Sequence, residues 1–159
     1  MLVINLKNRK SMKKNLIKSL PLLTTSVATA ISVLLIGSIP AFGQAITIVP
    51  QALSEPIVLQ GNSGGGQTSS NCGNIAAAPN HMVQLNADFP YLRFSLQGSG
   101  QPTLLIRLPN GTTSCISADS TTGRINAPGY WEQGSYEIYV GDRTGQRHPY
   151  TLSVTQRRN

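Results

Sequence analysis

Short segments in which apolar and polar residues alternate dominate the second half of the chain. In Tyr91–Gln97, for example, Leu92, Phe94 and Leu96 alternate with polar residues, and the pattern recurs twice nearer the C-terminus. Successive side chains of a β-strand point to opposite faces, whereas a helix would scatter these apolar residues around its axis. The alternation therefore predicts half-buried strands. By the same rule, Tyr139 is expected on the outward face of its segment.

Turn-forming residues separate these segments at the short intervals typical of an all-β domain. The sharpest hairpin signal is Pro109-Asn110-Gly111, because Asn and Gly accept the positive φ of a tight turn. No long helical pattern follows residue 43. We therefore predict an antiparallel β-sandwich or jelly roll of about eight strands. The predicted strands are 56–60, 82–86, 91–97, 103–108, 114–117, 123–126, 135–141 and 149–155.

Basic residues are concentrated at the N-terminus. The 159-residue chain has a net charge of +7, with 13 Lys and Arg against 6 Asp and Glu, but six of the cations precede residue 19. From Gln44 onward, seven Arg stand against all six acidic residues, a net charge of +1. The basic charge therefore belongs to a leader, and we expect no nucleic-acid partner.

The leader has the order of a secretory signal. A basic run, Lys7–Lys18, precedes the apolar stretch Leu20–Ile39, and small residues follow at Ala41–Gly43. We expect residues 1–43 to be a cleaved signal peptide, with cleavage after Ala45 as the alternative and Met12 as a second candidate start. We also expect the protein to be secreted or periplasmic. The apolar stretch is also long enough for an uncleaved anchor, which is the one membrane contact that the sequence allows.

The chain has two cysteines, Cys72 and Cys115. In an exported chain we expect them to form a structural disulfide, because the compartment is oxidising. A metal site is not expected, because the cysteines form no ligand cluster with His81 or His148 in the sequence. The acidic residues also lack the Asp-x-Asp spacing of a calcium loop, so the sequence predicts no metal and no other cofactor.

Four segments share a pattern of hydrophobic spacing. They are Tyr91-Leu-Arg-Phe-Ser-Leu, Thr103-Leu-Leu-Ile-Arg-Leu-Pro-Asn-Gly, Gly134-Ser-Tyr-Glu-Ile-Tyr-Val and Pro149-Tyr-Thr-Leu-Ser-Val-Thr. Together they resemble the bacterial pre-peptidase C-terminal (PPC) type of β-sandwich. The resemblance implies a sandwich over residues 81–159, preceded by an N-terminal extension, residues 44–80, with a Gly/Ser-rich loop and with 56–60 as a further strand. It also implies an exported accessory module, and we expect no enzyme activity.

Tyr130 and Trp131 form the first candidate ligand site. Exposed aromatic rings stack on sugars or anchor a protein partner, so the expected ligand is a cell-surface polysaccharide or another exported protein. In the competing interpretation, Trp131 covers the end of the core ahead of Gly134-Ser135-Tyr136, which is similar to a tyrosine corner.

Arg143, Arg147 and His148 form a second candidate ligand site, in a predicted turn between two strands. An alternative function, a hydrolase or hydrolase accessory domain, would place its chemistry in this Asp142–His148 loop. Such chemistry needs an activated nucleophile, and the neighbouring sequence provides no evident one. A solvated hairpin loop is the simpler interpretation.

The string Gly61-Asn62-Ser63-Gly64-Gly65 resembles the nucleophile loop of trypsin-like serine proteases. That mechanism requires a histidine base and an aspartate partner in defined positions, and here both histidines follow the serine. The Gly/Ser-rich stretch 61–73 produces such a string by composition alone, so we interpret it as a flexible loop.

Overall fold

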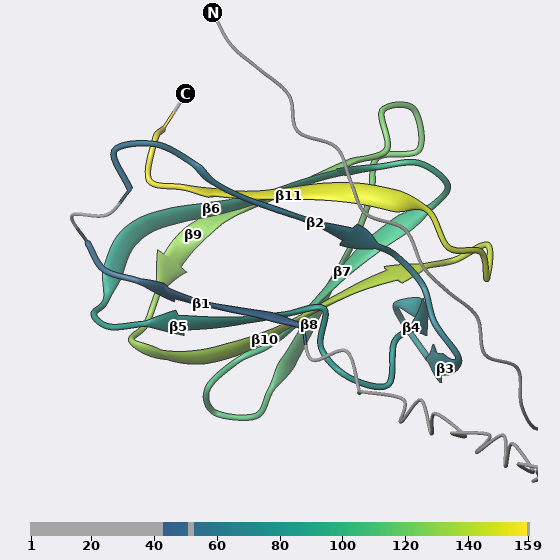
Figure 1. The fold of residues 1–159 in the computed structure, drawn as a ribbon, viewed down its shortest axis with the longest axis horizontal. Helices are drawn as coiled ribbons and strands as arrows, with labels where there is room; N and C mark the ends of the chain where they lie inside the picture. Colours follow the sequence, from purple (N-terminus) through teal and green to yellow (C-terminus); the bar gives the residue numbers. More distant parts are fainter. Residues whose placement is uncertain (1–42, 51–52, 159) are drawn as a thin grey trace, which may run out of the picture. The chain divides into compact units, whose positions relative to one another are not determined.

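The strands of the protein form two β-sheets that face one another (Figure 1). The computed structural model describes residues 43–50 and 53–158, so the predicted signal peptide, residues 1–43 with its candidate start at Met12, lies outside them apart from Gly43. The strands are β1 (Gln44–Ile48), β2 (Ile57–Asn62), β3 (Gln67–Ser69), β4 (Gly73–Ile75), β5 (His81–Leu85), β6 (Phe89–Gly98), β7 (Pro102–Arg107), β8 (Thr113–Ser117), β9 (Arg124–Trp131), β10 (Gly134–Asp142) and β11 (Pro149–Thr155). No helix in this part of the chain is long and apolar enough to cross a bilayer.

Sheet A has seven strands and sheet B has four. Sheet B runs in the order β2-β11-β6-β9 and is antiparallel throughout. In sheet A, β10 is central: it pairs with β5 and β4 along one edge and with β7 along the other. The sheet continues from β5 to β1, from β7 to β8 and from β4 to β3. The β1–β5 pair is parallel, which is an exception to the predicted antiparallel pairing.

All eight predicted strands are present, and the predicted all-β sandwich is confirmed. Three further strands, β1, β3 and β4, bring the number in the described residues to eleven. Residues 44–80, which were expected as an extension, contribute β1 and β3–β4 to sheet A and β2 to sheet B. β3 and β4 have three residues each, too few to produce a readable alternation.

The apolar faces of the two sheets meet in one core. Leu92, Phe94 and Leu96 on β6, which were predicted to face inward, are fully buried. Each contributes roughly 1.5–3 kcal/mol to the stability of the fold relative to an exposed position. Other fully buried side chains of this core are Ile48, Leu85, Phe89, Leu104, Ile138 and Leu152.

A second, smaller apolar cluster covers the outer face of sheet A. Tyr139 lies on this face, as predicted, yet it is only 6% exposed because Cys72 and Leu105 pack with it. Cys72 precedes β4 and Cys115 lies on β8, and their Cα atoms are 5.9 Å apart across a disulfide. The predicted disulfide is therefore present, and it links the β3–β4 hairpin to β8 within sheet A.

Candidate functional site

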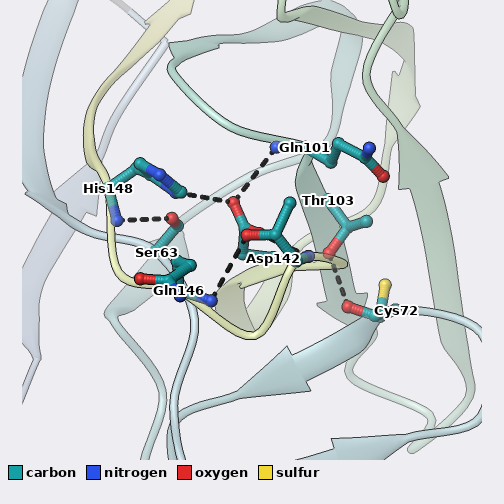
Figure 2. A network of polar contacts seen from close by, with 8 residues as sticks. Ser63, Cys72, Gln101, Thr103, Asp142, Gln146 and His148 are labelled. Carbon is teal, nitrogen blue, oxygen red and sulfur yellow. Dashed lines mark hydrogen bonds and ion pairs between the residues drawn. The ribbon is translucent and has the colours of Figure 1, made fainter.

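A polar cluster lies where the turn after β10 meets the loop after β2 and the β6–β7 turn (Figure 2). We call Ser63, Gln101, Asp142, Thr144 and His148 the Asp142 cluster. The Asp142 carboxylate is fully buried and accepts hydrogen bonds from the Gln101 amide at 3.2 Å and from both the amide and the hydroxyl of Thr144. The Nδ1 atom of His148 lies 3.1 Å from Oδ2. Because an ionised carboxylate only accepts, this nitrogen carries the proton.

Two opposing effects act on the pKa of Asp142. Burial raises it, but the hydrogen bonds from Thr144, His148 and Gln101 outweigh burial, so the pKa lies below its ordinary value. The side chain is therefore ionised at neutral pH. Its contacts join the β6–β7 turn to the β10–β11 turn, so its role is structural.

Ser63 lies beside His148, but it is not placed as a nucleophile. Its hydroxyl accepts a hydrogen bond from the main-chain N–H of His148 at 3.2 Å, and its own N–H donates to the His148 carbonyl at 2.8 Å. A catalytic serine instead presents its hydroxyl to a ring nitrogen of the base and to the substrate. Ser63 is only 1% exposed. Serine, histidine and aspartate thus meet in space without the geometry of a catalytic triad.

The Gly/Ser-rich stretch 61–73 makes main-chain hydrogen bonds beside the Asp142 cluster. Gly64 has a φ of 74°, and a Cβ atom there would lie 2.5 Å from the Gln146 carbonyl oxygen. Its N–H donates to the Val140 carbonyl at 2.9 Å. The segment predicted as a flexible loop is therefore hydrogen-bonded to the β10–β11 hairpin. The contacting residues Ser63 and His148 are 85 positions apart in the sequence. No sequence pattern signals a contact between segments so far apart.

The three predicted ligand residues of the β10–β11 turn do not converge. Arg143 and Arg147 are exposed and line two different hollows. The His148 ring turns toward Asp142 instead, and its side chain is 28% exposed. Within the described residues, no group of three or more His, Cys, Asp or Glu side chains is suited to hold a metal ion.

Tyr130 and Trp131 lie at the end of sheet B opposite the β10–β11 turn. Trp131 pairs with Phe89 at the start of β6, whereas the end of β6, at Gly98, pairs with the start of β11. The indole N–H of Trp131 donates to the Leu92 carbonyl at 3.0 Å. Its ring centroid lies 4.5 Å from that of Phe94. Trp131 therefore closes the end of the core.

Tyr136 completes this closure. Its ring lies 5.3 Å from that of Trp131, centroid to centroid, and its hydroxyl donates to the Glu132 carbonyl at 2.9 Å. A tyrosine that bonds back to the main chain a few residues upstream is the defining contact of a tyrosine corner. The motif Gly134-Ser135-Tyr136 therefore has the structural role that its pattern indicated.

Tyr130, by contrast, has a ring that faces solvent, with 59% of the residue exposed. Its hydroxyl donates to Asp88 Oδ2 at 2.8 Å, and Asp88 Oδ1 accepts from the Gln133 amide at 2.7 Å. The bonds from Gln133 and Tyr130 lower the pKa of Asp88, and the bond to Asp88 raises the pKa of Tyr130. The exposed ring is thus held in one orientation.

A groove of about 530 Å³ runs beside Tyr130, between β8 of sheet A and β9 of sheet B. Each of these strands pairs with a single neighbour among the described residues, so the sandwich is open along this side. We call it the β8–β9 groove. Apolar side chains, including Leu108, Ile116 and Trp131, contribute to its lining, together with the polar residues Asn110, Ser114, Asn126 and Glu132.

The fold and these surfaces define a small, disulfide-linked β-sandwich with an open groove between its sheet edges. No family model matches the chain. A protein of Synechococcus elongatus, described only as uncharacterised, is 39% identical over 103 residues, which cover 62% of this chain and 75% of that protein. The chain belongs to the same family as this cyanobacterial protein.

A solved structure with a similar fold is the pre-peptidase C-terminal domain of a collagenase from Bacillus anthracis. The TM-score is 0.48 and the sequence identity 14%, over 71% of this chain and 96% of that domain. It is the kind of β-sandwich that the strand motifs of the sequence resemble, and the likeness is one of fold.

Proposed function

We propose that the protein is an exported, non-catalytic binding module that holds a polysaccharide in the β8–β9 groove. The observation that carries the proposal is the exposed ring of Tyr130, held by Asp88 at the side of a groove with apolar and amide-bearing walls. Aromatic rings stack on the apolar faces of sugars, and a fixed ring loses little conformational freedom on binding.

The polar residues of the groove support a carbohydrate ligand in particular. Asn110 and Asn126 offer amide N–H donors, and Ser114 offers a hydroxyl that donates and accepts; both kinds of group match the hydroxyl groups of sugars. An apolar lining interrupted by a few polar groups is the usual composition of a ligand site. Trp131 contributes a wall and not a free ring, because its indole is packed against Phe94.

The Asp142 cluster supports the non-catalytic part of the proposal. Its serine is buried and bonded to main chain, and its carboxylate joins turns of the fold. A hydrolase in the Asp142–His148 loop would need an accessible nucleophile beside the His148 ring.

Export is supported by the basic and apolar leader and by the disulfide. Gln44, the residue after the predicted cleavage site, begins β1 and pairs with His81. Cleavage after Gly43 would therefore leave the strand intact. Intact-mass measurement of the protein recovered outside the cytoplasm should give a chain that begins at Gln44, whereas a chain that still begins at Met1 or Met12 would refute cleavage.

The ligand is tested with an array of bacterial cell-surface polysaccharides. We expect Tyr130→Ala to reduce binding about tenfold, and Tyr130→Phe, which keeps the ring, to retain most of it. The control is Val58→Ala on β2, which removes an apolar side chain of similar exposure, 57%, from the other edge of sheet B. A folded protein that binds no polysaccharide, or that binds equally well without the Tyr130 ring, would contradict the proposal.

A further inference from the structure

The β8–β9 groove carries charge of one sign. Its lining includes one carboxylate, that of Glu132, and no lysine, arginine or histidine among the described residues. The arginines of β6 and β9, Arg93 and Arg124, line another hollow, on the outer face of sheet B. Glu132 therefore sets the charge of the groove wall.

Glu132 lies in the turn between β9 and β10, and hydrogen bonds fix the main chain of this turn. Asp88 accepts from the Tyr130 hydroxyl at 2.8 Å and from the Gln133 amide at 2.7 Å, so it holds the chain on both sides of Glu132. The Glu132 carbonyl accepts from the Tyr136 hydroxyl at 2.9 Å. The carboxylate is thus carried by a segment with a defined position at the groove.

The Glu132 side chain itself is available to a ligand. The residue is exposed, and no ion pair or side-chain hydrogen bond among the described residues engages its carboxylate. The bond to Asp88 raises the pKa of Tyr130 and burial raises that of Tyr136, and the charge of Glu132 adds to both effects. An unpaired carboxylate in a groove without a cation complements a positively charged ligand.

The Tyr130 ring complements the same kind of ligand. The face of an aromatic ring has negative partial charge and attracts a cation. This ring is 59% exposed, and its hydroxyl is held by Asp88. Tyr130 and Glu132 are two positions apart in the sequence and both line the groove, so one ligand can contact both.

We propose that the β8–β9 groove selects a polysaccharide with free amino groups, whose ammonium groups bind the Glu132 carboxylate and the face of the Tyr130 ring. This inference rests on the proposed function and narrows it, because the ligand becomes a cationic amino-sugar polymer and not a neutral or acidic glycan. An ammonium group has three donors and no acceptor, whereas a carboxylate only accepts, so the two groups match.

A lysine side chain of a protein partner offers the same ammonium group. It has no sugar ring to stack on Tyr130, however, and no hydroxyl groups to bond with the amides of Asn110 and Asn126 in the groove. The combination of a fixed ring, amide donors and one carboxylate therefore favours an amino sugar over a basic protein segment.

Titration calorimetry with a matched set of hexasaccharides tests the inference. Cellohexaose and the hexamers of N-acetylglucosamine and glucosamine share one linkage and differ in a single substituent, which is a hydroxyl, an acetamide or an amine. At a pH at which the amines are protonated, the glucosamine hexamer should bind about tenfold more tightly than the two neutral hexamers. Added salt should weaken the binding of the glucosamine hexamer and leave that of the neutral hexamers unchanged.

Glu132→Gln removes the charge and keeps the size of the side chain. It should lower the affinity for the glucosamine hexamer about fivefold and leave the affinity for the neutral hexamers unchanged. The matched control is Glu55→Gln, which removes the same charge beside β2 at the other edge of sheet B, where Glu55 pairs with Arg157. This control should bind all the hexamers as the unchanged protein does.

The outcomes separate the inference from the proposed function. Equal binding of the hexamers, or an undiminished preference for the glucosamine hexamer in Glu132→Gln, would overturn the inference and leave the proposed function standing. Binding of no hexamer by folded protein would overturn the inference, and a silent polysaccharide array would overturn the proposed function as well. Tighter binding of hexalysine than of the glucosamine hexamer would also overturn the inference, because charge without a sugar would then suffice.

Discussion

The Nδ1 atom of His148 lies 3.1 Å from Oδ2 of Asp142, a carboxylate that solvent does not reach. Gly100 lies against both of these side chains. A Cβ atom at this position would lie 2.4 Å from Nδ1 of His148 and 2.6 Å from Oδ2 of Asp142. The hydrogen bond between His148 and Asp142 therefore depends on a residue without a side chain at position 100.

Gly100→Ala should destabilise the protein more than Gly111→Ala. Both glycines have positive φ, 74° and 82°, so both variants lose about 1–2 kcal/mol through backbone strain. Nothing lies within 4 Å of a Cβ atom at Gly111, whereas at Gly100 the new methyl must separate His148 from Asp142. We expect a total loss of about 3 kcal/mol or more for Gly100→Ala in urea unfolding. Equal losses in the two variants would show that the hydrogen bond between His148 and Asp142 tolerates the methyl group.

The disulfide should make a large contribution to stability. It joins cysteines 43 residues apart, and closing a loop of that length contributes about 4 kcal/mol in the chain-entropy model. Replacing Cys72 and Cys115 together with Ala should lower the free energy of unfolding by about this amount. Reduction of the unchanged protein is the control and should give a similar loss. The unreduced, denatured protein should contain no reactive thiol, and finding two would contradict the assignment.

Tyr130 and Trp131 should respond differently to truncation. Trp131→Ala removes a ring packed on Phe94 and Tyr136 and should cost about 3–5 kcal/mol of stability. Tyr130→Ala removes an exposed ring with one hydrogen bond and should cost about 1 kcal/mol. Since the chain has a single Trp, its fluorescence reports this site directly. A red-shifted, readily quenched emission would contradict the packed position.

The protein should lose stability as the pH falls below about 6.5, the ordinary pKa of histidine. His81 is 1% exposed and its Nε2 lies 2.7 Å from the Tyr150 hydroxyl. Burial lowers the His81 pKa in the folded state, so between that pKa and 6.5 the unfolded chain binds more protons. Urea unfolding at pH 8, 6.5 and 5 should show this decline. His81→Gln should flatten it, and an unchanged slope in that variant would assign the decline to another group.

The sequence predicted the strands better than it predicted the roles of the candidate ligand residues. Tyr130 and Trp131 are adjacent aromatic residues, which the sequence pattern alone does not distinguish. Tyr130 faces solvent, whereas Trp131 is packed against the core. Their different roles follow from strand alternation along β9, which directs neighbouring side chains to opposite faces of the sheet.

The amino-acid sequence by itself determined the class of fold, the strands with readable alternation and the cysteine pair. Alternation and turn chemistry are local properties, so they can be read within a few residues of one another. Only the tertiary structure decided how Ser63, Gln101 and Asp142 come together, and why Tyr139 on the outer face is covered. Those contacts depend on which strands pair and on what packs over them, and alternation within one strand contains no information about its neighbours.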